Sequence, residues 1–191
     1  MSEASRNNFS LEPKKLEIER AKTGDQDAMH MLYSYYSIAM LNTSYRILNN
    51  KEDAEDVLQE AFVKAFSSLK QFNYQSTFGA WFKRIVVNQS IDQLKKRRKE
   101  IFCENEITVE IKASNEGLPE GDVQEKLNVL YKALHQLPDG YRTVFSLYLL
   151  EGYDHDEISE ILNIEVSTSI SQLSRAKKKL KLLMTKASSY G

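Results

Sequence analysis

Basic and hydrogen-bonding side chains gather near the C-terminus, in a pattern suited to contact with nucleic acid. Six cations follow one another there without an intervening acid: Arg175, Lys177, Lys178, Lys179, Lys181 and Lys186. Cations in such a run suit DNA phosphates, which add salt-dependent affinity but no sequence information. Groups that can discriminate bases stand nearer the start of the same segment. These groups are Thr168, Ser171, Gln172 and Arg175, and Lys179 shares their outer face.

Three helical patterns separated by turns would position this basic segment. The first spans 141–150 after a Pro-Asp-Gly turn, and the second spans 156–162 after the cap residue Asp154. A tight turn at Asn163 leads to the third, which starts at about Ser167 and has an inner face of Leu173, Ala176, Leu180 and Met184. The pattern predicts a helix-turn-helix, which fits a DNA major groove. A three-helix bundle with an ordinary solvated charged side is the alternative.

A second basic segment, Gln71–Glu100, combines aromatic side chains with a long helix. One predicted face holds Phe78, Trp81, Phe82 and Ile85, a second holds Val87, Ile91 and Leu94, and a polar stripe between them holds Arg84, Asn88, Asp92, Lys95 and Lys99. The aromatic rings could stack on unpaired bases, at about 1 to 3 kcal/mol per base. At helical spacing such rings are more often core, and we favour the core for Phe78, Trp81 and Phe82. The loop 73–76 and the polar stripe are the better candidates for nucleic-acid contact.

Two further helices are predicted before this segment. The first runs from about Asp25 to Leu48, with a buried stripe of Met29, Leu32, Tyr33, Tyr36 and Met40. The second runs from Lys51 to Leu69, with an apolar side of Ala54, Val57, Leu58, Ala61, Phe62, Ala65, Phe66 and Leu69, and a polar side of Asp53, Asp56, Gln59, Glu60 and Lys64. Acids early in a helix favour the positive end of its dipole. If the acids of this helix serve only to stabilise its dipole, they need no binding partner.

Charge is segregated along the chain, although 26 Lys and Arg residues nearly balance 27 Asp and Glu residues. The basic run Lys95–Lys99 is followed by an acidic stretch that contains Gly and Pro. We therefore predict an all-α protein of two small helical domains joined by an acidic linker, the C-terminal one a helix-turn-helix. The expected parts are a flexible 1–11, an N-terminal domain 12–100, a linker 101–123 and a C-terminal domain 124–187. Residues 107–111 alternate like a strand, but an isolated strand has no pairing partner and stays in the linker.

Several classes of protein are excluded by the composition. No apolar run is long enough to span a membrane and the first residues lack a signal-peptide core, so we expect a cytoplasmic protein. Cys103 is the only cysteine, and His30, His135 and His155 lack metal-ligand spacing. The sequence has neither a phosphate-binding glycine loop nor a nucleophile elbow. We expect no catalytic residue, no metal, no cofactor and no small-molecule substrate, and hence not an enzyme.

Three motifs resemble a known family. They are DAEDVLQEAFVKAF (Asp53–Phe66), FNYQSTFGAWFKRIVVNQSIDQLKKRRK (Phe72–Lys99), and LPDGYRTVF with LEGYDHDEISEIL and LSRAKKKL in the C-terminal part. Together they look like a bacterial RNA polymerase sigma factor of the extracytoplasmic-function (ECF) group of the sigma-70 family. The C-terminal motifs LPDGYRTVF and SQLSRAKKKL look most like those of members from the Bacteroidetes. The resemblance covers most of the chain in the group's order. It implies a non-enzymatic subunit that binds core RNA polymerase and directs promoter-specific initiation.

The resemblance also implies which residues meet each partner. The polymerase-binding set is Asp53, Asp56, Gln59 and Glu60. The set at the −10 element, where a flipped base is read and the duplex melts at a cost of a few kcal/mol, is Asn73, Tyr74, Gln75, Ser76, Arg84, Asn88, Asp92, Lys95 and Arg98. The set at the −35 element is Ser167, Thr168, Ser171, Gln172, Arg175 and Lys178.

Two further partners or roles come from the same resemblance. An anti-sigma factor, often membrane-anchored, is expected to cover the polymerase and DNA faces of the two domains. The acidic linker would thread through the polymerase toward the RNA exit path and imitate nucleic acid there. A plain solvated tether explains the linker's composition as well.

The start of the last helix departs from the family pattern. Family members usually carry a Ser cap at the position of Glu165, and Lys and Arg at the positions of Ile170 and Gln172. Loss of a Ser cap costs about 0.5 to 2 kcal/mol unless another residue substitutes, and the missing cations remove phosphate or guanine contacts. We therefore predict weakened or altered −35 recognition.

Two competing classes remain. A stand-alone helix-turn-helix regulator would use its N-terminal half for dimerisation or signal binding, and it would not need the docking side of helix 51–69. An inert helical scaffold would leave no footprint on DNA, with or without polymerase.

Overall fold

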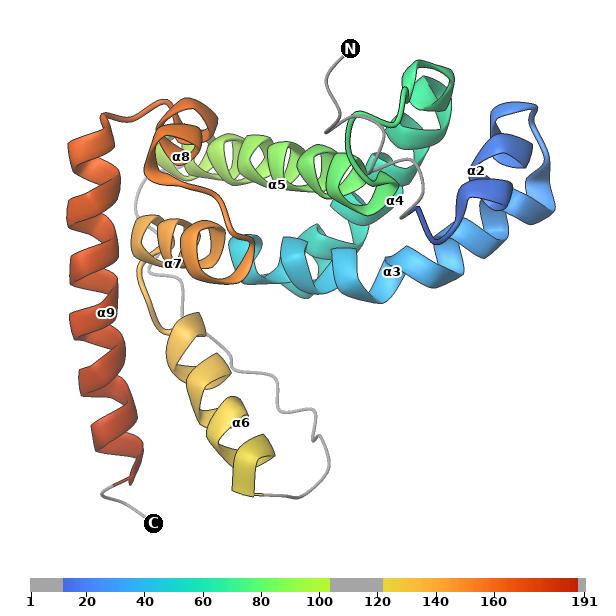
Figure 1. Ribbon diagram of the computed structural model, residues 1–191. Helices are drawn as coiled ribbons and strands as arrows, with labels where there is room; N and C mark the ends of the chain where they lie inside the picture. The colour runs from blue at the N-terminus through green and yellow to red at the C-terminus, as the bar shows by residue number, and fades with distance from the viewer. Residues whose placement is uncertain (1–11, 104–121, 189–191) are drawn as a thin grey trace. The chain divides into compact units, whose positions relative to one another are not determined.

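The computed structural model describes residues 12–103 and 122–188. The chain forms two compact units, Met1–Gln93 and Leu94–Gly191, and every regular element in the described part is a helix (Figure 1). The all-α prediction is confirmed. The predicted flexible segment 1–11 lies outside the described residues, as does most of the predicted linker 101–123, including its strand-like stretch 107–111.

The N-terminal unit begins with α2 (Lys15–Lys22) and α3 (Gln26–Leu48). Asp25 caps α3 by accepting a hydrogen bond from the Ala28 amide at 3.1 Å, and Asn49 ends the helix in the left-handed conformation with φ 54°. The predicted helix 25–48 is thus confirmed. In contrast, α2 is not among the predicted helices, because only two of its eight residues are buried and they form no repeating stripe.

The next helices are α4 (Lys51–Ser68), the short 3₁₀ turn η1 (Leu69–Gln71) and the long α5 (Phe78–Cys103). Asn50 caps α4 by accepting from the Asp53 amide at 2.9 Å. The apolar side predicted for α4 is buried, apart from Phe66, which is half-buried. The prediction for α3 is wrong at Tyr33, whose side chain is 40% exposed because its ring lies at the core's edge against Phe62, with centroids 4.6 Å apart.

Aromatic rings from three helices form the centre of the N-terminal unit. Phe82 of α5 packs on Phe62 of α4 with ring centroids 4.4 Å apart, and Phe78 packs on Tyr36 of α3 at 5.1 Å. Phe78 and Phe82 are fully buried, which confirms that they belong to the core rather than to a base-stacking surface. Trp81 is half-buried at the edge of the same cluster. This packing fixes the orientation of α5 and therefore of its polar stripe.

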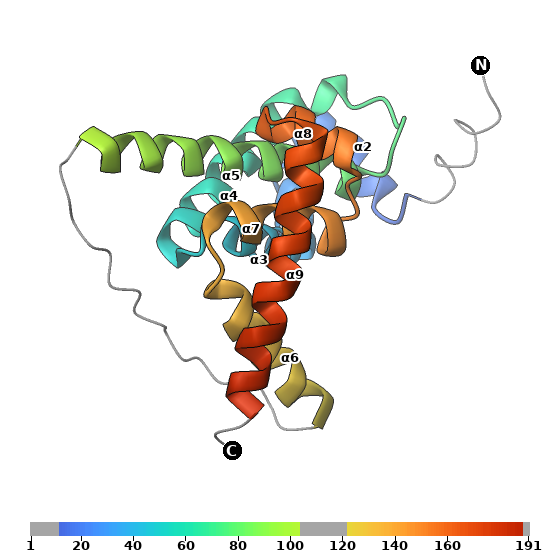
Figure 2. The same cartoon turned by 90° about the vertical axis from the view of Figure 1, so that its left-hand side faces the viewer.

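The C-terminal unit contains α6 (Asp122–His135), α7 (Asp139–Phe145), α8 (His155–Leu162) and α9 (Val166–Ser188). Helix α9 packs against α6, α7 and α8, and Figure 2 shows it as one continuous helix. Its predicted inner residues Leu173, Ala176 and Leu180 are buried. The helix-turn-helix order predicted from 141 onward is present, and α6 is an additional helix that the sequence patterns did not indicate.

The first predicted helix of this motif is not a regular α-helix along its whole length. It begins at Asp139 as α7, and its second half, Ser146–Leu150, is the π-helical segment η2. The buried guanidinium of Arg142 lies beneath its start, donating to the Leu137 carbonyl at 2.9 Å and to the Asp139 carboxylate at 2.7 Å. Val144, Leu147 and Tyr148 also fit the three-and-four spacing of an α-helix, so this spacing did not indicate a π-helical segment.

Candidate nucleic-acid interface

The loop between η1 and α5 presents polar side chains beside the start of α5. Asn73 and Gln75 are exposed, whereas Tyr74 and Ser76 are half-buried. The Asn73 side chain accepts a hydrogen bond from the Gln75 amide at 3.3 Å, which forms a local turn. Thr77 closes the loop, because its hydroxyl accepts from the Ala80 amide at 3.3 Å in the first turn of α5. The four predicted −10 loop residues therefore lie together on a short, structured turn.

Tyr74 has an unusual backbone and a well-defined side-chain environment. Its φ of 60° lies in the left-handed region, which aromatic residues rarely occupy. Its hydroxyl donates to the Glu19 carboxylate at 2.5 Å, and the Lys22 ammonium lies 4.5 Å from the centre of its ring. The hydrogen bond from Tyr74, followed by that from Lys22, lowers the pKa of Glu19, and burial, followed by the bond to Glu19, raises the pKa of the Tyr74 phenol. Sequence patterns gave no sign of this contact with α2.

The predicted polar stripe of α5 continues from the loop along one side of the helix. Arg84, Asn88, Asp92 and Lys95 are all exposed, as the helical projection predicted. Arg98 lies within α5, but its side chain lies outside the described set. The loop leads into α5 at Phe78, and the stripe runs along that helix.

The polar side of α4 carries the predicted polymerase-binding residues. Asp56, Gln59 and Glu60 are exposed, whereas Asp53 is half-buried and accepts a hydrogen bond from Gln93 of α5 at 3.2 Å. The structure therefore brings three of the four residues together on an open surface and ties the fourth to α5.

A groove of about 260 Å³ lies between α3 and α4 beside this polar side. Its lining is mixed and consists of Tyr33, Ser37, Ile38, Leu41, Glu55, Leu58 and Gln59. Ile38 is 72% exposed, and Val63 on α4 is 70% exposed. Exposed apolar side chains beside exposed acids are typical of a protein-binding surface. The exposed apolar side chains of Ile38 and Val63 were not predicted, because they fall outside the periodic stripes of core residues on α3 and α4.

The turn between α8 and α9 has the geometry expected of a helix-turn-helix. Asp154 and Glu157 form a capping box at the start of α8, with the Asp154 carboxylate accepting from the Glu157 amide at 2.8 Å. Asn163 ends α8 in the left-handed conformation with φ 54°. His155 of α8 also contacts α9, because its Nδ1 lies 2.8 Å from the Ser169 hydroxyl, which is buried. The start of α9 is thus fixed by α8.

The predicted −35 residues divide into two groups on α9. Ser167, Ser171, Arg175 and Lys178 are exposed, and Thr168 is half-buried. Gln172 is half-buried beside α7, and a Cβ atom at Gly140 would lie 3.3 Å from its amide oxygen. Ile170 is 52% exposed, so an apolar side chain occupies an open position at the front of the helix.

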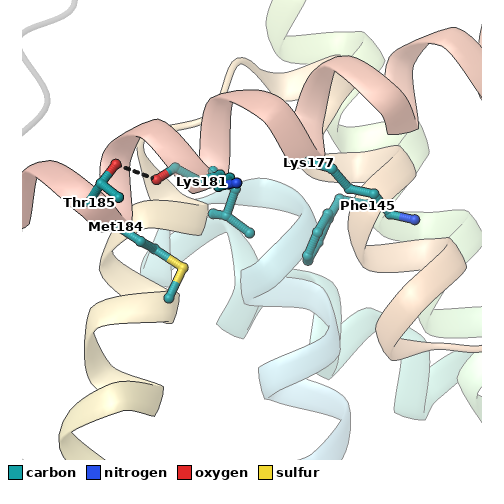
Figure 3. A pocket seen from close by; sticks show the side chains of 6 residues that line it. Phe145, Lys177, Lys181, Met184 and Thr185 are labelled. Atoms are coloured by element: carbon teal, nitrogen blue, oxygen red, sulfur yellow. Dashed lines mark hydrogen bonds between the residues drawn. The ribbon is translucent and has the colours of Figure 1, made fainter.

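A pocket of about 380 Å³ lies farther along α9 (Figure 3). Phe145, Leu180 and Met184 form its apolar wall, and Lys177, Lys181 and Thr185 complete the lining. Two cations beside an apolar hollow suit a protein segment with apolar and acidic side chains better than they suit DNA bases.

The described segments contain neither a metal-binding cluster nor a helix that could span a membrane. Within residues 12–103 and 122–188, no three His, Cys, Asp or Glu side chains are placed to hold a metal ion. Over the same segments, every helix is too short or too polar to cross a membrane.

Comparison with known proteins decides the family. Residues 32–100 match the family model described as sigma-70 region 2, and residues 116–180 match the model described as sigma-70, region 4. The chain belongs to the sigma-70 family. It is 33% identical over 181 residues to the ECF RNA polymerase sigma factor SigW of Bacillus subtilis, an alignment covering 87% of this chain and 94% of that relative. It is 30% identical over 171 residues to the ECF RNA polymerase sigma-E factor of Haemophilus influenzae, covering 84% and 89%.

Two solved structures have a similar fold. The sigma factor RpoE of Bartonella quintana, in complex with the anti-sigma factor NepR, matches with a TM-score of 0.60 at 23% identity, covering 82% of this chain and 96% of that one. CnrH, in complex with the cytosolic domain of CnrY, matches with a TM-score of 0.53 at 23% identity, covering 91% and 97%. The sigma factor described here acts in promoter-specific transcription initiation with RNA polymerase, and sigma factors are not a class of enzymes.

Proposed function

We propose that this sigma factor binds core RNA polymerase through α4, using the exposed side chains of Asp56, Gln59 and Glu60. The observation that carries the proposal is that these three polar residues lie together beside the groove of mixed polar and apolar lining between α3 and α4. A partner helix with basic and apolar side chains would satisfy both parts of this surface. Asp53 has a different role on this account: through Gln93 it fixes α5 relative to α4.

The loop 73–76 and the polar stripe of α5 act at the −10 element. The turn holds Asn73 and Gln75 in the open, where their amides can hydrogen-bond to the edge of an unstacked base. Arg84 and Lys95 on the stripe supply charge for the phosphates of the opening duplex, and Asn88 supplies a hydrogen-bonding amide between them. Arg98, farther along α5, belongs to the same set by the family pattern.

The start of α9 acts at the −35 element. Ser167, Ser171 and Arg175 are exposed there, and Lys178 follows on the same helix to meet phosphate. Because Gln172 lies against the start of α7 and Ile170 is apolar, we expect fewer polar contacts than in family members with Lys and Arg at these positions.

Control of this sigma factor comes from a separate anti-sigma factor. The exposed apolar side chains of the α3–α4 groove and the pocket of Phe145, Leu180 and Met184 both offer surfaces for such a protein. The sigma factor itself acts in the cytoplasm, where polymerase and promoter DNA are found. It has no catalytic role of its own and needs no cofactor or small-molecule substrate. The acidic linker either imitates nucleic acid within the polymerase or serves as a tether.

Charge reversal at Asp56 and Glu60 tests the docking surface. The variant Asp56→Lys, Glu60→Lys should bind core polymerase more than about tenfold more weakly, because two lysines in place of the exposed acids would repel a basic partner. The matched control, Asp27→Lys with Glu160→Lys, makes the same change in net charge at exposed positions on α3 and α8 and should bind normally. Equal binding by both variants would show that Asp56 and Glu60 do not contribute to docking on polymerase.

A further inference from the structure

The loop proposed to capture the −10 base contains a residue in a conformation that its type disfavours. Tyr74 has φ 60°, a region in which an aromatic side chain crowds its own backbone. Such a conformation persists only where surrounding contacts impose it, and it is often found at functional sites. What holds Tyr74 therefore also determines the shape of the loop.

The contacts that hold Tyr74 come mainly from α2. The Glu19 carboxylate accepts the Tyr74 hydroxyl at 2.5 Å, although 55 residues separate the two in the chain. Lys22, one turn later on α2, pairs with Glu19 at 3.0 Å and lies over the Tyr74 ring at 4.5 Å. The Phe72 ring also packs against Tyr74, with ring centroids 4.7 Å apart. The phenol is thus bound by a carboxylate, an ammonium group and a second ring.

The other end of the loop is held by the same N-terminal segment. Glu12, which is 7% exposed, accepts a hydrogen bond from the Phe78 amide at 2.7 Å. Phe78 is the first residue of α5, so Glu12 satisfies a free amide at the start of that helix. Segment 12–22 therefore contacts the loop at Tyr74 and again where the loop enters α5.

We infer that Glu12, Glu19 and Lys22 are positioning residues for the −10 loop, and that Tyr74 shapes the loop instead of contacting the base. With Tyr74 turned toward α2, its neighbours Asn73 and Gln75 are the side chains left exposed to meet a base. This inference rests on the proposed role of loop 73–76 at the −10 element. It adds a first helix to the base-reading site and gives Tyr74 a different role from its neighbours.

The test measures base discrimination by the complex of full-length sigma factor and core polymerase. The probe is a single-stranded non-template −10 oligonucleotide, taken from a promoter mapped with this protein, with each of the four bases at the captured position. Tyr74→Phe and Glu19→Ala should each reduce the preference for the correct base by about tenfold, the scale of a lost hydrogen bond to a charged group. The double variant should be no worse than either single variant. Glu19→Gln, which keeps an acceptor oxygen, should retain most of the preference.

Two controls separate loop positioning from general damage. Glu17→Ala removes another ion-paired acid of α2, which bonds Lys14 at 3.2 Å, and Tyr35→Phe removes an exposed phenol from α3. Both should discriminate like the unaltered protein. All variants should bind core polymerase equally and remain folded, with the same helix content by circular dichroism, at the temperature of the assay.

Two results would overturn the inference in different ways. If the unaltered complex discriminates but Tyr74→Phe and Glu19→Ala do so equally well, only the inference fails. A loss of discrimination in Tyr74→Ala alone would then show that the ring stacks directly on the base. If the unaltered complex does not discriminate, the proposed role of the loop fails and the inference fails with it.

Discussion

At the scale of single residues, the front of α9 presents an apolar side chain where we propose contact with DNA. Ile170 is 52% exposed in the turn of α9 that should face DNA, and Gln172 turns toward Gly140. An exposed isoleucine can contact a thymine methyl group, but it cannot pair with phosphate or guanine. Promoter selection should therefore depend less on the −35 element and more on the −10 loop.

Restoring a cation at this position should strengthen −35 binding. Ile170→Lys adds one phosphate contact, so the plot of log affinity against log salt should steepen by about 0.9 for a −35 duplex. Leu182→Lys, an equally exposed change near the end of α9, is the control and should leave the slope nearly unchanged. Fluorescence anisotropy with polymerase-bound sigma factor measures both. Equal slopes for Ile170→Lys and the unaltered protein would show that this position does not approach the backbone.

The Glu19–Tyr74 contact should leave a signature in the pH dependence of stability. Because the folded-state pKa of Glu19 lies below the ordinary value of 4.5, its contribution is present above pH 4.5 and is lost as pH falls through the lower folded value. The difference in unfolding free energy between the unaltered protein and Glu19→Gln should therefore shrink as pH is lowered from 7 toward 3. Urea unfolding at a series of pH values measures it, and a pH-independent difference would contradict the contact.

The sequence allows the exposed residues of a helix to be predicted, but not contacts between residues that lie far apart in the chain. Asp56, Gln59 and Glu60 were correctly predicted to be exposed, because the helical period alone determines which side of α4 they occupy. The contacts of Glu12 and Glu19 with the loop region were not predicted. Their partners lie 66 and 55 positions away in the chain, and local spacing carries no information about such contacts.

At the scale of elements, the helix-turn-helix depends on how α8 begins. Two reciprocal hydrogen bonds join Asp154 and Glu157 there, with the Asp154 amide donating to Glu157 at 3.0 Å. Helix α8 has only eight residues, so its own backbone hydrogen bonds give it little stability. The capping box should therefore contribute strongly to the geometry of the whole motif.

Removing the cap should destabilise the C-terminal unit. Asp154→Ala should lower its unfolding free energy by about 1 kcal/mol, within the usual range of about 0.5 to 2 kcal/mol for a lost N-cap. Asp156→Ala removes an exposed acid from the same turn without removing the cap and should cost only a few tenths of a kcal/mol. Chemical denaturation followed by circular dichroism compares them, and equal losses would argue against a role for the capping box.

The elements also show which helices a sequence can reveal. Helices α3, α4 and α8 have caps and apolar stripes, and their limits were predicted to within a residue or two. Helix α2 was not predicted because it buries only Ile18 and Ala21. The π-helical segment Ser146–Leu150 was predicted as an α-helix because its apolar residues also fit that spacing. In both cases the period of the hydrophobic residues is weak or ambiguous.

At the scale of the whole molecule, function depends on dividing different tasks between two small helical units. The N-terminal unit presents a mixed acidic and apolar surface on α3 and α4 and a polar stripe on α5. The C-terminal unit presents the basic helix α9, which we propose contacts the −35 element. An acidic surface on one unit and a basic surface on the other suit a protein that must bind another protein and DNA at the same time. Composition over the full chain hides this, because acids and bases nearly cancel.

Transcription by purified core RNA polymerase on fragments of the source genome, with and without this protein, tests most directly whether the protein directs initiation. Mapping of the 5′ ends should show new, discrete start sites that share upstream elements and appear only when the protein is present. Those starts should disappear with Asp56→Lys, Glu60→Lys and persist with the Asp27→Lys, Glu160→Lys control. DNA binding by the isolated protein without any new start would contradict the account and favour a stand-alone regulator.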